Sequence, residues 1–257
     1  MDSSALHSTR SASGDTASAS RHVEQKIAQL LVNRLQYSTR ADETTRIIAR
    51  MHYEILNERR QALLPKLAHW KKDFYLAGGT GLAFHIGHRQ SIDFDFFSPK
   101  PIQTDQLFDS LRTALSPHSI LKIQEEPNTI SVIADETIKI SFMTYDYPML
   151  EALTEEPYLA IASVRDIAAM KLSAIVSRAT TKDYTDIFFI LKEHSLEMLL
   201  KDAKKKYPEL DTNLILKSLV YFDDIIDEPL IFQKGYTASL DEVKTALIEK
   251  VRQYTAQ

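Results

Sequence analysis

The stretch from Leu76 to Phe97 reads LAGGTGLAFHIGHRQSIDFDFF, with a glycine pair near one end and two alternating aspartates near the other. Side chains two positions apart in a β-strand point to the same face, so this pattern places Asp93 and Asp95 together. The opposite face would carry three apolar side chains: Ile92, Phe94 and Phe96. Two carboxylates at this spacing repel each other, and a Mg²⁺ ion bound to both relieves the repulsion. The stretch therefore predicts a strand with two Mg²⁺ ligands, although alternate acids also occur on exposed faces of antiparallel sheets.

The glycine pair, Gly78 and Gly79, follows a short apolar run at 74–77 and precedes a second apolar run that ends at Gly87. This order predicts a strand, a tight turn and a short helix. Glycine permits close approach of the backbone, and the free N–H groups at a helix start favour a phosphate. A triphosphate site beside the two acids is therefore expected. The run GGTGLAF lacks the third glycine of a Rossmann turn and the Lys-Ser/Thr of a P-loop, which argues against those two functions.

The composition of the 257 residues is that of a folded globular protein, with 44% hydrophobic and 26% charged residues. The formal net charge of -4 provides no protein-wide positive field, so any contact with RNA must be local. The absence of cysteine excludes disulfides, thiolate metal sites and a cysteine nucleophile. No apolar run approaches the ~18 residues of a membrane span, so we expect a cytoplasmic protein with no membrane partner.

Four regions are predicted along the chain: a disordered tail at 1–22, N-terminal helices at 23–69, an α+β core at 70–148 and a helical domain at 149–257. Two helices are expected between Val23 and Ala68, with Met51 and Ile55 on the apolar face of the second. The alternation at 129–145, interrupted at Asp135-Glu136, predicts a β-hairpin. Strand character is expected to stop at Pro148.

Helices are predicted in the second half from apolar spacing and caps. Ser163 and Asp166 form a candidate capping box for the first helix, and a break at ATTKD separates it from a second helix interrupted near His194. The basic run KDAKKKY at 201–207 is expected to be a solvated helix end, with an RNA-backbone contact as the alternative. His85 and His88 are expected to be exposed rings at a helix end rather than metal ligands.

The run from Leu76 to Phe97 resembles the glycine-pair, spacer and D-x-D signature of the DNA polymerase β-like nucleotidyltransferase superfamily. More narrowly, it resembles the AbiEii/AbiGii abortive-infection toxin family, which has a GGT-x-L-x-x-x-x-x-H-R-x-S-x-D-F-D-F-F-like run. The segment RDIAAMKLSAIVSRATTKDYTDIFFIL at 165–191 is similar to the second block of that family, in which a helical lysine precedes a K-D-x-x-D segment. The resemblance implies a nucleotidyltransferase core, a short mixed sheet flanked by helices, followed by a C-terminal helical bundle.

Site residues are carried over at the matching positions. Gly79 and Thr80 would contact the triphosphate, Lys171 would meet phosphate, and Asp183 would support the site from the next helix. Lys171 and Arg178 are also two cations on an otherwise apolar helix face, which requires an anion or an acidic partner. The predicted nucleotide-binding set is Gly78, Gly79, Thr80, Lys171, Arg178 and Asp186. The predicted catalytic set is Asp93, Asp95, Lys171 and Asp183, and its two strand acids are the predicted metal ligands. A purely structural ion pair of Lys171 with Asp183 or Asp186 remains the alternative.

The resemblance implies Mg²⁺-dependent transfer of a nucleoside monophosphate from an NTP to an acceptor hydroxyl on tRNA or protein. It also implies a phage-defence toxin that a separately encoded DNA-binding antitoxin neutralises. One position departs from active relatives of this superfamily, because Ser141 occupies the place where a third carboxylate is expected, on a strand face shared with Lys139 and Met143. Without that acid, the metal, Asp146 or Asp183 would have to activate the hydroxyl. The second hypothesis is a nucleotide- or partner-binding module without catalysis.

Overall fold

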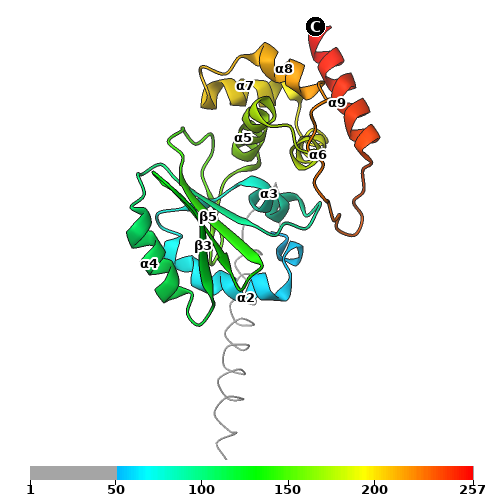
Figure 1. Ribbon diagram of the computed structural model, residues 1–257. Coiled ribbons are helices and arrows are strands. Elements are labelled where there is room, and N and C mark those ends of the chain that lie inside the picture. The colour runs from blue at the N-terminus through cyan, green and yellow to red at the C-terminus, as the bar shows by residue number, and fades with distance from the viewer. Residues whose placement is uncertain (1–50, 257) are drawn as a thin grey trace, which may run out of the picture. The chain divides into compact units, whose positions relative to one another are not determined.

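The computed structural model describes residues 51–256, which belong to one compact unit that spans Ala49–Gln257 (Figure 1). The predicted tail at 1–22 and the predicted helix near residues 27–35 lie outside the described residues. The expected helix through Met51 and Ile55 is wrong, because irregular backbone leads there into a single 3-10 turn, η1 (Tyr53–Ile55). Both apolar side chains are still buried, so their spacing serves the core without a helix.

The strands between Tyr75 and Ile161 form one seven-stranded mixed sheet, with strand order β3-β4-β5-β2-β1-β7-β6. The strands are β1 (Tyr75–Leu76), β2 (Phe94–Ser98), β3 (Ile120–Glu126), β4 (Thr129–Ala134), β5 (Ile138–Thr144), β6 (Thr154–Glu155) and β7 (Ala160–Ile161). The pairs β2–β5 and β1–β7 are parallel, and the other neighbours are antiparallel. The predicted α+β class with a mixed sheet and flanking helices is confirmed.

Helices cover the sheet and form a separate bundle after it (Figure 1). They are α2 (Glu58–Leu67), α3 (Gly78–Ile86), α4 (Thr104–Ala114), α5 (Val164–Ser177), α6 (Thr181–Ile190), α7 (Leu196–Lys206), α8 (Thr212–Leu219) and α9 (Leu240–Thr255), with a 3-10 turn η2 (Ala68–Trp70) after α2. The predicted breaks after α5 and near His194 are confirmed. None of the helices between residues 51 and 256 has the length and apolar character needed to cross a bilayer.

Two hydrophobic cores result from this arrangement. Phe94, Phe96 and Phe142 pack on the sheet face that α2 and α4 cover. Tyr75 and Phe97 belong to the second core, which the helices α5 to α9 share. The alternation in β2 therefore divides its side chains between a buried face and the face that meets the bundle.

Several strand predictions are confirmed and two are wrong. The hairpin β4–β5 turns at Asp135 and Glu136, which both have positive φ. Ile92 precedes β2 and is 51% exposed, so it does not extend the buried face. Strand character does not stop at Pro148, because β7 pairs with β1 and β6 pairs with β7. Strands of two residues are too short to show alternation, which explains why the sequence pattern misses them. The domain division at residue 148 stays a prediction.

Candidate active site

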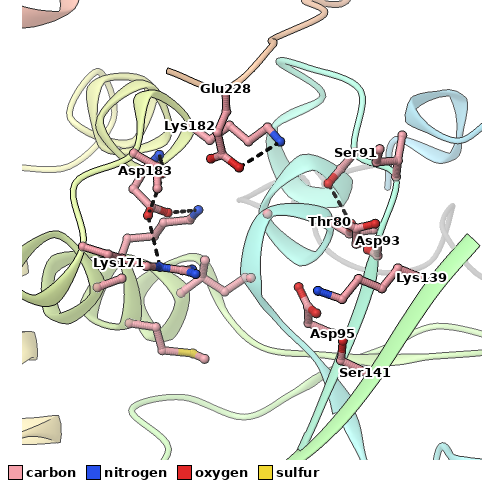
Figure 2. A pocket seen from close by; sticks show the side chains of 18 of the residues that line it. Thr80, Ser91, Asp93, Asp95, Lys139, Ser141, Lys171, Lys182, Asp183 and Glu228 are labelled. Atoms are coloured by element: carbon pink, nitrogen blue, oxygen red, sulfur yellow. Dashed lines mark hydrogen bonds and ion pairs between the residues drawn. The ribbon is translucent and has the colours of Figure 1, made fainter. Parts of the chain in front are cut away.

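A cavity of about 760 Å³ opens between the sheet and the helices α5 and α6, within the range of ligand pockets (Figure 2). Most of the predicted site residues line it: Gly78, Gly79, Thr80, Asp93, Asp95, Lys171, Arg178 and Asp183. Asp186 does not line the cavity and is fully buried behind it. The fold therefore brings together the glycine pair, the strand acids and the second predicted block, which are far apart in the sequence.

The strand acids lie side by side in this cavity at the start of β2. Asp93 directly precedes the strand, and Asp95 is paired in register with Ser141 of the parallel strand β5. Burial raises the pKa of Asp95, and the negative charge of Asp93 raises it further. Lys139 and a hydrogen bond from Ser141 act in the opposite direction. The two carboxylates are therefore an electrostatically unfavourable pair that a cation would stabilise.

Glycine is required at the start of α3 by its close neighbours. Gly78 has φ of +64°, and a Cβ atom there would lie 3.3 Å from the Oδ2 atom of Asp95. At Gly79, a Cβ atom would lie 2.4 Å from Nη2 of Arg89, which is not compatible with the guanidinium position. The backbone at the start of α3 therefore lies against an acid on one side and a cation on the other. Gly78, Gly79 and Thr80 line the cavity, and the free N–H groups of a helix start favour a phosphate.

Thr80 connects α3 to the acid strand. Its hydroxyl forms a hydrogen bond of 2.7 Å with Oγ of Ser91 and another with the carbonyl oxygen of Asp93. The side chain is buried, so it is engaged inside the protein. A contact of Thr80 with a triphosphate would therefore use its backbone N–H, while its hydroxyl positions the acid strand.

A buried ion cluster that includes side chains of α5 and α6 borders the cavity. Lys171 Nζ lies 2.7 Å from Asp183 Oδ1 and 2.6 Å from Asp186 Oδ2. Asp186 also accepts hydrogen bonds from Nε and Nη2 of Arg89, both at 2.8 Å, and contacts Nε2 of His88 at 2.7 Å. Burial alone would lower the pKa of Lys171, but the two aspartates outweigh it and raise this pKa. Burial would raise the pKa of Asp186, yet Lys171 and Arg89 hold it well below its usual range. Lys171 is therefore a fully charged, doubly paired lysine at the edge of the cavity.

His88 and Arg89 also belong to this cluster, although the sequence predicted no role in the site for either residue. The prediction of an exposed His88 ring is wrong, since the side chain is 0% exposed. Burial lowers the pKa of His88, so the ring is neutral at pH 7 and donates from Nε2 to Asp186. His85 is also not free, because its Nε2 contacts the carbonyl oxygen of Ala162. The only sequence signal was the H-R pair inside the run that resembles the toxin family.

The basic run at 201–207 is less available than its composition predicts. Lys206 is fully buried and bonds to Asp166 Oδ1 and to the carbonyl oxygen of Pro148, both at 2.9 Å. The Ser163 side chain caps α5 by accepting from the Asp166 N–H group, whereas the Asp166 carboxylate accepts from the backbone N–H groups of Leu150 and Glu151 and from Lys206, so only half of the predicted capping box forms. The solvated helix end is therefore a wrong prediction for Lys206.

Two further cations stand at the rim of the cavity. Arg178 is 68% exposed, with Nε 3.9 Å from Asp183 Oδ2. Lys182 pairs with Glu228 at 3.5 Å, and Glu228 belongs to the segment between α8 and α9 that borders the cavity (Figure 2). Arg178 is exposed and Lys182 is partly exposed, so both can reach a ligand. From the buried cluster, Lys171, Asp183 and Arg89 line the cavity.

The sheet, the glycine-bordered helix start and the facing acid pair define a nucleotidyltransferase fold. A solved structure with the same fold is MenT4, the nucleotidyltransferase toxin Rv2826c from Mycobacterium tuberculosis H37Rv, with a TM-score of 0.55 and 13% identity over 77% of this chain and 82% of that chain. JHP933 from Helicobacter pylori gives a TM-score of 0.49 with 20% identity over 79% of this chain and 92% of that chain.

Residues 62–256 match the family described as nucleotidyl transferase AbiEii toxin, Type IV TA system, and the chain belongs to this family. It is 38% identical over 191 residues to the uncharacterized protein aq_aa25 of Aquifex aeolicus (strain VF5), which covers 71% of this chain and 88% of that protein. The family named by the resemblance is thereby confirmed.

Proposed function

We propose that this nucleotidyltransferase toxin transfers a nucleoside monophosphate from an NTP to an acceptor hydroxyl with Mg²⁺ as cofactor. The observation that supports this proposal most is the common cavity of the acid pair and the start of α3. A triphosphate bound there would have backbone N–H groups on one side and the cations of α5 and α6 on another. The acids would then lie next to the phosphate at which substitution occurs.

The residues present fit a Mg²⁺ site of two carboxylates. Asp93 and Asp95 would hold the ion, and the raised pKa of Asp95 reflects a like-charge contact that a cation would relieve. Between residues 51 and 256, no three His, Asp or Glu side chains gather into a metal site, so water and substrate oxygens would complete the coordination. A bound Mg²⁺ would neutralise phosphate charge and lower the pKa of the acceptor hydroxyl.

Ser141 takes the place of a third acid. It lies opposite Asp95 in the ladder and donates a hydrogen bond to that carboxylate. Its hydroxyl cannot serve as a base of useful strength at neutral pH, so it positions Asp95 instead.

The other two candidate bases are poorly placed. Asp183 is engaged by Lys171 at 2.7 Å and by the Thr180 hydroxyl at 3.0 Å, so it cannot reach across the cavity without losing both contacts. Asp146 is exposed and does not line the cavity. The residues therefore favour activation of the acceptor at the acid pair, without a separate protein base.

The family supports an NTP as donor and a separately encoded antitoxin as partner, here proposed to be a DNA-binding protein. We propose a hydroxyl of tRNA or protein as the acceptor and phage defence as the biological role. Both the donor and these acceptors are abundant in the cytoplasm, where we expect the protein to act.

Incubation of the protein with labelled NTPs, Mg²⁺ and total tRNA tests the proposal. Label is expected in the acceptor with wild type and with Asp109→Ala, a matched change of an exposed aspartate on α4. Asp93→Ala and Asp95→Ala are expected to abolish it. Incorporation that survives both changes would refute the proposed site. NTP binding by calorimetry without any incorporation would favour the second hypothesis, a binding module that lost catalysis with its third acid.

A further inference from the structure

A strap, defined as residues 226–233 in the segment between α8 and α9, borders the cavity on the side of α6 (Figure 2). Its backbone is bonded at both ends. Ile226 forms hydrogen bonds of 2.8 and 3.1 Å with the junction of α5 and α6, and Ile231 and Gln233 form bonds of 2.8 and 3.0 Å with the loop after α3. Glu228 lies between these attachments and lines the cavity. The strap is therefore held in place without a contribution from the Glu228 side chain.

Glu228 places a carboxylate among the cations that border the cavity. Its Oε1 atom lies 3.5 Å from Nζ of Lys182 in the first turn of α6, and the two side chains are 35% and 29% exposed (Figure 2). Its charge also reaches Arg89, whose guanidinium lies beside Gly79. Burial would lower the pKa of Arg89, but Asp186 outweighs burial, and Glu228 raises this pKa further. Glu228 therefore acts on cations beside the starts of both α6 and α3.

The proposed transfer reaction assigns no step to Glu228. The proposed metal ligands are Asp93 and Asp95, and the backbone already holds the strap. A triphosphate between the start of α3 and the cations of α6 would need the ammonium group of Lys182, which faces Glu228. One ammonium group cannot fully neutralise a carboxylate and a phosphate at the same time. Glu228 and the phosphate chain would therefore compete for Lys182.

We propose that Glu228 is a competing anion, which occupies Lys182 in the nucleotide-free site and yields it to the phosphate chain of the NTP. The inference rests on the proposed nucleotidyl transfer and identifies a residue that limits nucleotide affinity at the same site. Glu228 is a positioning residue, because it acts on the nucleotide through Lys182. After transfer, pyrophosphate meets the same competitor, so the return of Lys182 to Glu228 favours the release of pyrophosphate.

Binding of inorganic triphosphate, the part common to every NTP, tests this inference by calorimetry in the presence of Mg²⁺. Glu228→Gln keeps the size of the side chain and removes its charge, and it is expected to tighten binding about fivefold. A merely structural role of Glu228 would give the opposite sign, because a disturbed cavity binds more weakly. Lys182→Met is expected to weaken binding about fivefold. In the Lys182→Met protein, Glu228→Gln should tighten binding less than about twofold, because the competition for Lys182 is gone.

Asp227→Asn is the matched control, because Asp227 precedes Glu228 on the strap but does not line the cavity. Its Oδ1 atom accepts a hydrogen bond of 3.0 Å from the Thr181 hydroxyl, which asparagine can also accept, so triphosphate affinity should stay within about twofold of wild type. An unchanged or weaker affinity in Glu228→Gln would overturn the inference. An equal gain in Asp227→Asn, or the full gain in the Lys182→Met protein, would also overturn it.

The binding measurement requires no acceptor and no turnover, so the two proposals can fail separately. Nucleotide transfer by wild type together with no gain in Glu228→Gln counts against the competing anion alone. A gain in Glu228→Gln without any transfer by wild type supports the competing anion and counts against the proposed function alone.

Discussion

Replacement of Asp186 by asparagine removes the negative charge at the centre of the buried ion cluster. Asp186 is 0% exposed and has four polar contacts at 2.6 to 2.8 Å, with Lys171, His88 and two nitrogens of Arg89. Lys171 and Arg89 are balanced by Asp183 and Asp186, so the amide leaves one positive charge without compensation in a buried place. Loss of one partner from a buried ion pair costs about 3 to 5 kcal/mol. We expect the free energy of unfolding to fall by this amount, a large part of the ~5 to 15 kcal/mol typical of a domain.

Urea denaturation measures this loss. With a slope of about 2 to 3 kcal/mol per molar urea, the midpoint of Asp186→Asn should fall by about 1 to 2 M. Glu197→Gln is the control, because Glu197 makes an exposed pair with Lys201 at 2.7 Å on α7, and its replacement should leave the urea midpoint close to that of wild type. Because the pKa of Asp186 is well below its usual range, the wild type should lose the same stabilisation only as pH falls below about 4. An unchanged midpoint together with lost NTP binding would refute the structural role and place Asp186 at the nucleotide.

Three further results are expected. Gly79→Ala should weaken NTP binding more than about tenfold by calorimetry, because its Cβ would lie 2.4 Å from Arg89 Nη2. Gly235→Ala is the control: Gly235 has φ of +95° and nothing within 4 Å of a Cβ atom, so this change should cost about 1 kcal/mol of stability and leave NTP affinity unchanged. Asp95→Asn should raise the melting temperature of the metal-free protein while it abolishes transfer, because burial and the neighbouring carboxylate raise the pKa of Asp95; a lower melting temperature would contradict this. Burial lowers the pKa of His88, so the unfolded chain binds a proton more readily than the folded protein, and the wild type should lose stability as pH falls below about 6.5. His88→Gln should flatten the dependence of the free energy of unfolding on pH. Superimposable pH dependences of wild type and variant would exclude a contribution of His88.

The acid pair illustrates which parts of the site local sequence patterns can predict. Strict alternation around Asp95 predicted that both aspartates share a face. Alternation at 138–143, together with the third-acid position that the family resemblance implies, placed Lys139 and Ser141 toward the same site, and all four residues line the cavity. These predictions succeeded because strand periodicity depends only on neighbours along the chain. The same alternation failed at Ile92, where the strand had not yet begun and solvent rather than the core receives the side chain.

The two-residue strands and the buried His88 are features that local sequence patterns do not predict. β7 exists because Leu76 and Ile161 meet in a parallel ladder, and the intervening chain contains no periodicity that announces this pairing. His88 was expected to be exposed from its position at a helix end. It is buried because α6 covers it and provides Asp186, 98 residues later in the chain.

The sequence alone located the strand acids, the helix start at Gly78 and the breaks among the later helices. Periodicity, glycine placement and capping residues were sufficient for this, because these three signals reflect steric and hydrogen-bonding preferences within a few residues. The partners of the charged groups were settled by proximity in space. Lys171 is held by two aspartates of the next helix, and Asp186 is shared with Arg89, 97 residues away. Desolvation makes a buried charge depend on partners from any part of the chain, so its role follows from burial and three-dimensional neighbours.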